Sequence, residues 1–209
     1  MGSFRQNQTE TQPTLSRQDS SPYKGANSRL GIDSMRVRDE SMIHVCSLAR
    51  LYDTVEETGA LHIVTLLKDT DRVARPKTIL EANHLVLGMD DICVAMDGYV
   101  IPCDDHVTRL IEFVRGWDRA KPMVVHCYAG ISRSTAGAYV AACALNPRRD
   151  EMAIARELRR ASPTATPNAR IVSLADRVLG RDGRMVAAID SIGRGEMAYE
   201  GTPFRLDLE

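Results

Sequence analysis

One stretch of the sequence combines residue types that together can bind and attack a phosphate group. A cysteine, Cys127, is followed six positions later by an arginine, Arg133, and Gly130 lies in the short run between them. The apolar residues 123–125 before the cysteine predict a buried strand, and the Ala-rich residues after Ser134 predict a helix. The stretch is therefore predicted to form a strand, a tight loop and the first turn of a helix.

A loop in this position can form a binding site for an anion. A helix N-terminus leaves backbone N–H groups without partners and carries a partial positive charge. Folding the loop back over that end directs further N–H groups toward the same point. There a thiolate at Cys127 is stabilised, and the planar guanidinium of Arg133 can bind two phosphate oxygens. The alternative, a buried structural cysteine beside a surface arginine, does not explain why glycine, strand and helix coincide.

The arrangement His126-Cys127-(five residues)-Arg133-Ser134 resembles the phosphate-binding loop of the cysteine-based protein tyrosine phosphatases. The elements around it, over roughly residues 40–180, resemble the small dual-specificity-like branch of that superfamily. The resemblance implies that Cys127 attacks phosphorus and that the resulting thiophosphate is then hydrolysed. It also implies that the phosphate is held by the Arg133 side chain and by backbone N–H groups of Tyr128, Ala129, Gly130, Ile131, Ser132 and Arg133.

Two neighbours of this loop have roles that the same resemblance implies. Ser134 is expected to assist departure of the thiolate in the second step, and the alternative role is that of an ordinary helix cap. His126 is expected to support the loop, although a strand histidine that points away from the site could equally be a core residue. This chemistry requires no metal ion and no other cofactor.

The leaving group of a phosphate ester needs a proton, which a positioned carboxylic acid can supply. In the related enzymes an aspartate from a loop after the preceding strand has this role. Asp91 lies four positions after the end of a predicted strand, 84–87, and fits that pattern best. Asp90 and Asp97 are alternatives in the same region. We therefore expect Asp91 to be the general acid.

Several features of the tyrosine-specific branch are missing from the sequence. It has no Trp-Pro-Asp motif, no Asn-Arg-Tyr loop and no glutamine beyond Gln18. These differences favour a shallow, dual-specificity-like site that acts on phosphotyrosine, and also on phosphoserine or phosphothreonine, in proteins. The same chemistry on a phosphoinositide, a nucleotide or an RNA 5′-phosphate is an alternative, although the loop has no lysine. A silent phospho-residue-binding module is a further alternative, disfavoured because Cys127 and Arg133 are both present.

The predicted elements indicate an α/β fold. Strands and helices alternate, which predicts a central, mainly parallel sheet of about four to five strands flanked by helices, with a helical C-terminal half. The predicted strands are residues 42–46, 61–67, 84–87 and 123–125. The predicted helices begin at Ser47, at Asp104 or Asp105, at Ser134, at Asp150, at Asn168 and at Met185. Ser47, Asp104 or Asp105, and Asn168 are expected to cap their helices, and Asp150 suits the positive end of its helix.

Composition divides the chain into three parts. Residues 1–34, rich in Ser, Thr, Gln and Asn, predict a disordered N-terminal tail. Residues 35–193 are predicted to form the phosphatase domain, and residues 194–209 a loosely ordered C-terminal tail. The basic residues Arg159, Arg160 and Arg170 either contact acidic residues of a substrate or form a solvated face.

Charge and cysteine content limit the expected partners. The net charge of −1 provides no basic surface for nucleic acid or for an anionic membrane. The five cysteines lack CxxC and zinc-site spacings, which suits a reducing compartment, so a cytoplasmic protein is expected. The expected partners are phosphorylated proteins, and the sequence does not predict an oligomeric state.

Overall fold

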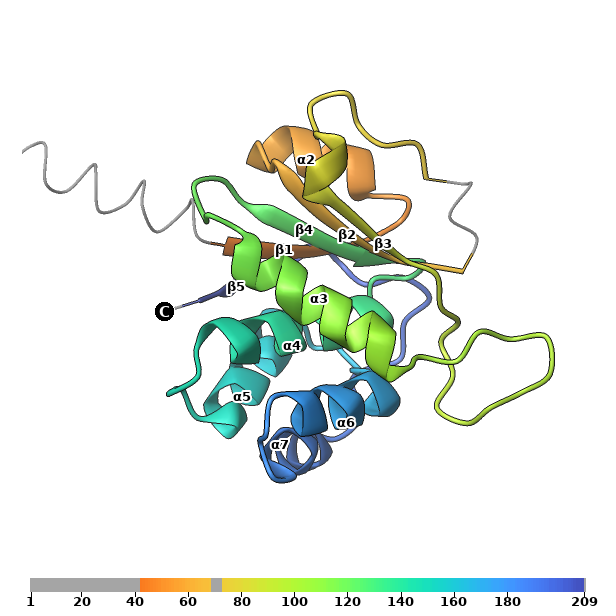
Figure 1. The fold of residues 1–209 in the computed structure, drawn as a ribbon, viewed down its shortest axis with the longest axis vertical. Helices are drawn as coiled ribbons and strands as arrows, with labels where there is room; N and C mark the ends of the chain where they lie inside the picture. Colours follow the sequence, from red (N-terminus) through yellow and green to blue (C-terminus); the bar gives the residue numbers. More distant parts are fainter. Residues whose placement is uncertain (1–41, 69–72, 209) are drawn as a thin grey trace, which may run out of the picture.

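The computed structural model describes residues 42–68 and 73–208, so the predicted tail 1–34 lies outside the described residues. Five strands form one sheet in the order β3-β2-β4-β1-β5 (Figure 1). The pairings among β3, β2, β4 and β1 are parallel, and β5 is antiparallel to β1. The strands are β1 (Met42–Ser47), β2 (His62–Leu66), β3 (His84–Leu87), β4 (Met123–Cys127) and β5 (Phe204–Asp207). The predicted α/β fold with a mainly parallel sheet is confirmed, and the edge strand β5 makes the sheet mixed.

Helices cover both faces of this sheet (Figure 1). One face carries α2 (Leu51–Thr58), and a short 3-10 helix, η2 (Glu81–Asn83), precedes β3. The other face carries α3 (Asp104–Gly116), α4 (Arg133–Leu145), α5 (Glu151–Ala161), α6 (Ala169–Val178) and α7 (Arg184–Ile192). The prediction of a helical C-terminal half is therefore confirmed.

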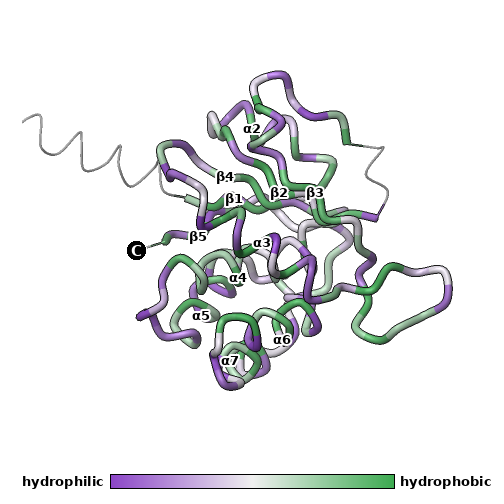
Figure 2. The backbone as a smooth tube through the Cα atoms, in the orientation of Figure 1, coloured by the Kyte–Doolittle hydropathy of each residue, from purple (hydrophilic) through white to green (hydrophobic). Residues whose placement is uncertain are grey.

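Helix α4 lies at the centre of the helical layer because its sequence is apolar on nearly all sides. Its residues from Arg133 to Ala144 are all buried, and it contacts strands β1, β2 and β4 as well as helices α3, α5 and α6. Figure 2 shows hydrophobic residues along the central strands of the sheet. The packing of α4 fixes its N-terminus beside the carboxyl end of β4, where Cys127 lies.

The predicted helix caps are confirmed in part. The side chains of Asp150 and Asn168 accept hydrogen bonds from backbone N–H groups at the starts of α5 and α6. Ser47, by contrast, is the last residue of β1, and α2 begins only at Leu51. The hydroxyl of Ser47 accepts a hydrogen bond from Arg50 N at 3.3 Å, just before α2, and also donates one to the carboxylate of Glu200.

The C-terminal segment differs from the loosely ordered tail predicted for residues 194–209. Phe204–Asp207 forms β5, with Leu206 opposite Ile43 of β1. Leu206 and Leu208 are both buried against the core. Alternation along a strand places these two leucines on the same face. A run of four strand residues is too short to stand out in the sequence, yet it makes this segment part of the domain.

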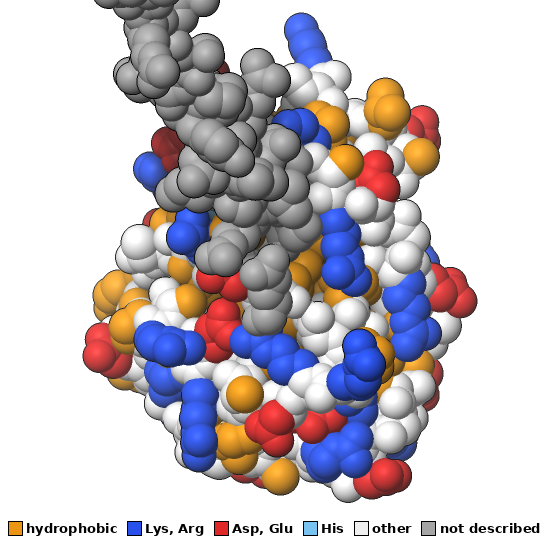
Figure 3. Space-filling model, turned by 90° about the vertical axis from the view of Figure 1, so that its left-hand side faces the viewer, with side chains coloured by type: hydrophobic (Ala, Val, Ile, Leu, Met, Phe, Trp, Pro, Cys, Tyr) orange, Lys and Arg blue, Asp and Glu red, His pale blue; other side chains and the backbone are white. Residues whose placement is uncertain are grey.

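Among the helices of the described residues, none has the length and apolar character needed to cross a membrane. On the face drawn in Figure 3, basic and acidic side chains are interspersed, in keeping with the net charge of −1. Apolar side chains are scattered among them (Figure 3). Such a mixed surface is ordinary for a folded protein, because polar groups are too few to cover it completely.

Candidate active site

The loop between β4 and α4 is curled, because several of its carbonyl groups are held by other parts of the chain. Four backbone N–H groups donate to carbonyl oxygens of the loop. They are Leu48 N to Tyr128 O (3.1 Å), Gly201 N to Ala129 O (2.8 Å), Thr166 N to Ile131 O (3.0 Å) and Asn168 N to Ser132 O (3.3 Å). In a planar trans peptide the N–H group points opposite to the C=O group. The N–H groups that follow these carbonyls therefore face the inside of the loop, where they can bind an anion.

Cys127 ends β4 with its side chain inside this loop. Only 2% of the residue is exposed. Its Sγ accepts a hydrogen bond from Gly130 N at 3.3 Å and lies 3.1 Å from Ser134 Oγ. Ser134, in the first turn of α4, is fully buried, so its hydroxyl is fixed next to the sulfur. A backbone N–H and a hydroxyl thus meet at the one atom that the sequence predicts as the nucleophile.

Gly130 allows the loop to lie directly against the first strand. Its φ of 75° is in the left-handed region, which glycine adopts without strain. A Cβ at this position would lie 2.8 Å from Ser47 N and 2.9 Å from the carbonyl carbon of Cys46. Both neighbours are backbone atoms of the central sheet and cannot move aside as a flexible side chain would. The curled conformation therefore depends on glycine at position 130.

Replacing Gly130 by alanine is expected to lower kcat for an aryl phosphate about tenfold and the free energy of unfolding by about 1–3 kcal/mol. The left-handed backbone strains the new residue, and its Cβ displaces either the loop or β1. Gly59→Ala is the matched control, because Gly59 has a φ of 64° but open space around its added Cβ. It should lose stability without losing kcat. A Gly130→Ala protein with wild-type kcat would contradict the proposed packing of the loop.

Arg133 is the first residue of α4, and its side chain lies beside the loop. Its Nη1 donates a hydrogen bond to Met89 O at 2.7 Å, which fixes the guanidinium plane. Its Nε is buried and has no hydrogen-bond partner among the residues described, and it lies 3.9 Å from Asp91 Oδ2. A guanidinium that is hydrogen-bonded at one end, with an Nε that makes no hydrogen bond, has a donor left for a bound oxyanion.

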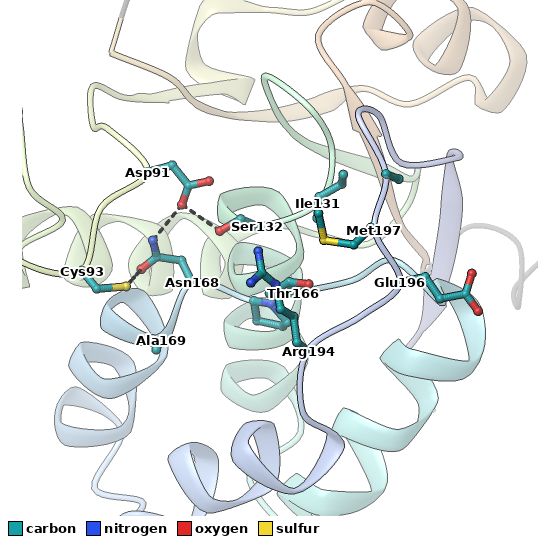
Figure 4. Close-up of a pocket in the computed structure, with 12 residues that line it drawn as sticks. Asp91, Cys93, Ile131, Ser132, Thr166, Asn168, Ala169, Arg194, Glu196 and Met197 are labelled. Carbon is teal, nitrogen blue, oxygen red and sulfur yellow. Dashed lines mark hydrogen bonds between the residues drawn. The ribbon is translucent and has the colours of Figure 1, made fainter.

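Asp91 lies over the same loop, at the start of the long segment between β3 and α3 (Figure 4). Its Oδ1 accepts hydrogen bonds from Ser132 Oγ at 2.7 Å and from Asn168 Nδ2 at 2.8 Å. These contacts place the carboxyl group beside the Arg133 guanidinium and directly above the curled loop. Its side chain remains 37% exposed, so it is accessible from solvent.

The two alternative aspartates are placed differently. Asp90 Oδ2 accepts a hydrogen bond from Val100 N at 2.7 Å and lies 3.4 Å from Lys68 Nζ. Its backbone N–H in turn donates to Val100 O, so Asp90 closes the base of the 91–99 segment. Asp97 is in the exposed part of that segment. Geometry therefore favours Asp91 as the carboxyl group nearest to the predicted nucleophile's loop.

His126 is a core residue behind the loop. It is fully buried, and its Nε2 lies 2.7 Å from Thr65 Oγ1, which is itself 2.8 Å from His84 Nε2. Burial, with smaller contributions from the charges of His84 and Arg133, lowers the pKa of His126 to about 4. The ring is therefore neutral near pH 7. Of the two roles left open by the sequence, the structure shows a hydrogen-bonded core histidine that could support the strand end next to Cys127.

A cavity of about 440 Å³ opens beside the Cys127–Arg133 loop (Figure 4). It lies between this loop, the start of the Asp91 segment, the N-terminus of α6 and the C-terminal segment. Its walls include Asp91, Ile131, Ser132, Asn168, Arg194 and Met197. Asp91 and Ser132 border both the curled loop and this cavity, so a ligand bound in one could extend into the other.

Sequence reasoning misses the contribution of the C-terminal segment to this site. Gly201 N donates to Ala129 O, and a Cβ at Gly201 would lie 2.9 Å from Gly130 O. Arg194 and Met197, from the same segment, line the cavity. Glycine at position 201 is a signal of close backbone approach, but its partner on the loop is not visible in the sequence. The segment therefore supports the loop from behind and extends the cavity beside it.

Comparisons with known proteins agree with this geometry. Residues 99–168, which include Cys127 and Arg133, match the protein-tyrosine phosphatase family model. The crystal structure of the Cydia pomonella PTP-2 phosphatase is similar, with a TM-score of 0.52 and 18% sequence identity, over 65% of this chain and 84% of that one. The crystal structure of DUSP15 is similar with a TM-score of 0.50 and 16% identity, over 71% of this chain and 90% of that one.

A comparison with curated protein sequences finds no match. At such low identity the two structural similarities concern the fold. The family match covers the segment that carries the curled loop, and the fold places that loop at the end of a central strand. Together these findings show a segment similar to the protein-tyrosine phosphatase family around Cys127 and Arg133, within a fold similar to those of the two phosphatases.

Proposed function

We propose that the protein hydrolyses phosphate monoesters of phosphorylated proteins through a covalent thiophosphate on Cys127. The observation that carries this proposal is the convergence of donors on one point. Cys127 Sγ is contacted by Gly130 N at 3.3 Å, Ser134 Oγ lies 3.1 Å away, and the buried Nε of Arg133 has no hydrogen-bond partner among the described residues. These groups suit a nucleophile facing a phosphate with three negatively charged equatorial oxygens.

In the first step the Cys127 thiolate attacks phosphorus in line with the ester oxygen. The S–P bond forms as the P–O bond to the leaving group breaks. Loop N–H groups and the Arg133 guanidinium hold the three equatorial oxygens, and a prearranged donor of this kind is typically worth ~10²–10³ in rate. The departing oxygen takes the proton of the Asp91 carboxyl group, which Ser132 and Asn168 hold in position.

In the second step water attacks the thiophosphate and the S–P bond breaks. Asp91, now a carboxylate, accepts a proton from that water, and inorganic phosphate forms. The sulfur leaves as a thiolate, and the buried Ser134 hydroxyl at 3.1 Å can donate a hydrogen bond to it. No redox change and no second protein nucleophile are needed.

The expected substrates are phosphotyrosine-containing proteins, with phosphoserine and phosphothreonine also accepted. Tyr128 in the loop is 66% exposed, and the cavity beside the loop is open, which suits a shallow site rather than a deep slot. All five cysteines lie within the described residues and are free. Free thiols are compatible with the cytoplasmic location predicted from the sequence, which remains part of this proposal.

Hydrolysis of p-nitrophenyl phosphate by the purified protein tests the reaction. We expect turnover that is unchanged by a metal chelator such as EDTA and is blocked by vanadate, which fits the same oxyanion site. A panel of phosphotyrosyl and phosphoseryl peptides and phosphoinositides then tests the substrate class. A protein that binds phosphopeptides without hydrolysing any phosphate ester would instead be a silent binding module. Preference for phosphoinositides would refute the assignment to protein substrates.

A further inference from the structure

The cavity beside the curled loop contains an unpaired cation. Arg194 lines it, and its guanidinium makes no hydrogen bond or ion pair with any residue in the described part of the chain. In Figure 4 the Arg194 side chain points toward Ser132, whereas the carboxylate of Glu196 points away from the cavity. Among the described residues that line the cavity, Asp91 is then the carboxylate that faces it, and it already accepts hydrogen bonds from Ser132 and Asn168. Arg194 is therefore available to an incoming anion.

The backbone that carries Arg194 is held firmly. The guanidinium of Arg159 donates to four carbonyl oxygens, those of Ala165, Ile192, Gly193 and Arg194, at 2.8 to 3.2 Å. The next residue, Gly195, donates its N–H to Thr166 Oγ1 at 3.1 Å. Because the backbone on both sides is fixed, binding a ligand there requires only the Arg194 side chain to be immobilised.

The three arginines that the sequence suggests for substrate contacts, Arg159, Arg160 and Arg170, lie elsewhere or make other contacts in the structure. Arg159 is committed to the carbonyl groups that hold the C-terminal segment. Arg170 Nε donates to Pro102 O at 2.7 Å and so holds the end of the Asp91 segment. Arg160 lines a separate cavity with Phe204 and Arg205. Arg194, which sequence reasoning does not single out, is the arginine that lies beside the curled loop.

We propose that this cavity binds an acidic side chain adjacent to the phosphorylated residue of a protein substrate, with Arg194 as the residue that determines this preference. The proposal rests on the phosphatase function proposed above and names the substrate sequence it favours. Asp91 and Ser132 border both sites, so a residue one or two positions from the phosphorylated one, at about 3.3 Å per residue in an extended peptide, reaches the cavity. Ile131, Pro167 and Met197 provide apolar walls for the stem of that side chain.

Matched pairs of phosphotyrosyl peptides that differ only in Glu against Gln test this preference, at each position from two before to two after the phosphotyrosine. At one position we expect wild-type kcat/KM to be about fivefold higher for the Glu peptide, a ratio typical of one well-placed charge-assisted contact. The ratio should fall to about one in Arg194→Gln and below one in Arg194→Glu. Raising the salt concentration should reduce the wild-type ratio, because the contact is partly exposed.

Arg156→Gln is the charge-matched control. Arg156 is an exposed arginine on α5 that lines neither cavity described here, so its variant should keep the wild-type ratio. A wild-type ratio near one at every position, or a ratio that Arg194→Gln leaves unchanged, would overturn the proposal.

The two proposals can fail separately. Hydrolysis of p-nitrophenyl phosphate establishes the reaction without any flanking residue. Binding of the same fluorescent Glu and Gln peptides to the Cys127→Ser protein, measured by anisotropy, reports the preference without turnover. Turnover with no Arg194-dependent preference in either assay would reject only the subsite. A preference in the binding assay without turnover would reject only the phosphatase.

Discussion

Replacing Cys127 by serine is expected to reduce kcat for p-nitrophenyl phosphate by at least about 10⁴-fold, the scale seen when an enzyme loses its nucleophile. A serine hydroxyl keeps its proton near neutral pH and has no adjacent base in this site, so it cannot replace a thiolate. The change is nearly isosteric, and Gly130 N and Ser134 Oγ can hydrogen-bond to oxygen as well as to sulfur. The variant should therefore fold and still bind vanadate.

The same substitution at Cys103 controls for general effects of removing a thiol. Cys103 is the N-cap residue of α3, a position at which serine is favoured. Cys103→Ser should retain wild-type kcat and thermal stability. Steady-state kinetics and circular-dichroism melting of both variants separate the outcomes. Substantial turnover by Cys127→Ser would exclude the covalent mechanism.

Replacing Asp91 by asparagine is expected to slow hydrolysis of phenyl phosphate by ~10²–10³-fold, but that of p-nitrophenyl phosphate by less than about tenfold. Phenolate is a poor leaving group and depends on protonation, whereas nitrophenolate leaves readily without it. Asparagine keeps an oxygen that can accept the hydrogen bonds of Ser132 and Asn168, so the site should keep its shape. The ratio of kcat/KM for the two substrates measures the effect.

Asp90→Asn provides the comparison for Asp91→Asn. Asp90 holds the base of the 91–99 segment through Val100 and Lys68. Its replacement should therefore reduce kcat/KM for both substrates equally or not at all. If Asp91→Asn also affected both substrates equally, Asp91 would not be the proton donor. A strong dependence on the leaving group in Asp90→Asn or in Asp97→Asn would move the role to that residue.

The reactive loop could be predicted from the sequence because its parts are consecutive. Strand, glycine-containing turn and helix start occur within a dozen residues, so local patterns are enough to predict a loop at a helix N-terminus. Cys127, Arg133 and Ser134 are therefore brought together by neighbours in the chain. The parallel strands were predictable for a similar reason, since fully buried strands give continuous apolar runs.

What the sequence does not show depends on contacts between distant residues. Local patterning leaves Asp90, Asp91 and Asp97 as alternatives, and bonds from Ser132 and Asn168 distinguish Asp91 only in the folded chain. The role of the C-terminal segment is hidden likewise, because β5 is short and Arg194 resembles any surface arginine.

The four hydrogen bonds that hold the carbonyl groups of the curled loop link activity to complete folding. They come from residues 48, 166, 168 and 201, on three separate stretches of chain. A synthetic peptide copying residues 123–145 would carry Cys127, Arg133 and Ser134 yet lack the distant backbone contacts that curl the loop. The reactive geometry is thus a property of the complete tertiary structure. Phosphatase activity should therefore be lost in the same cooperative transition as the fold, and not gradually before it.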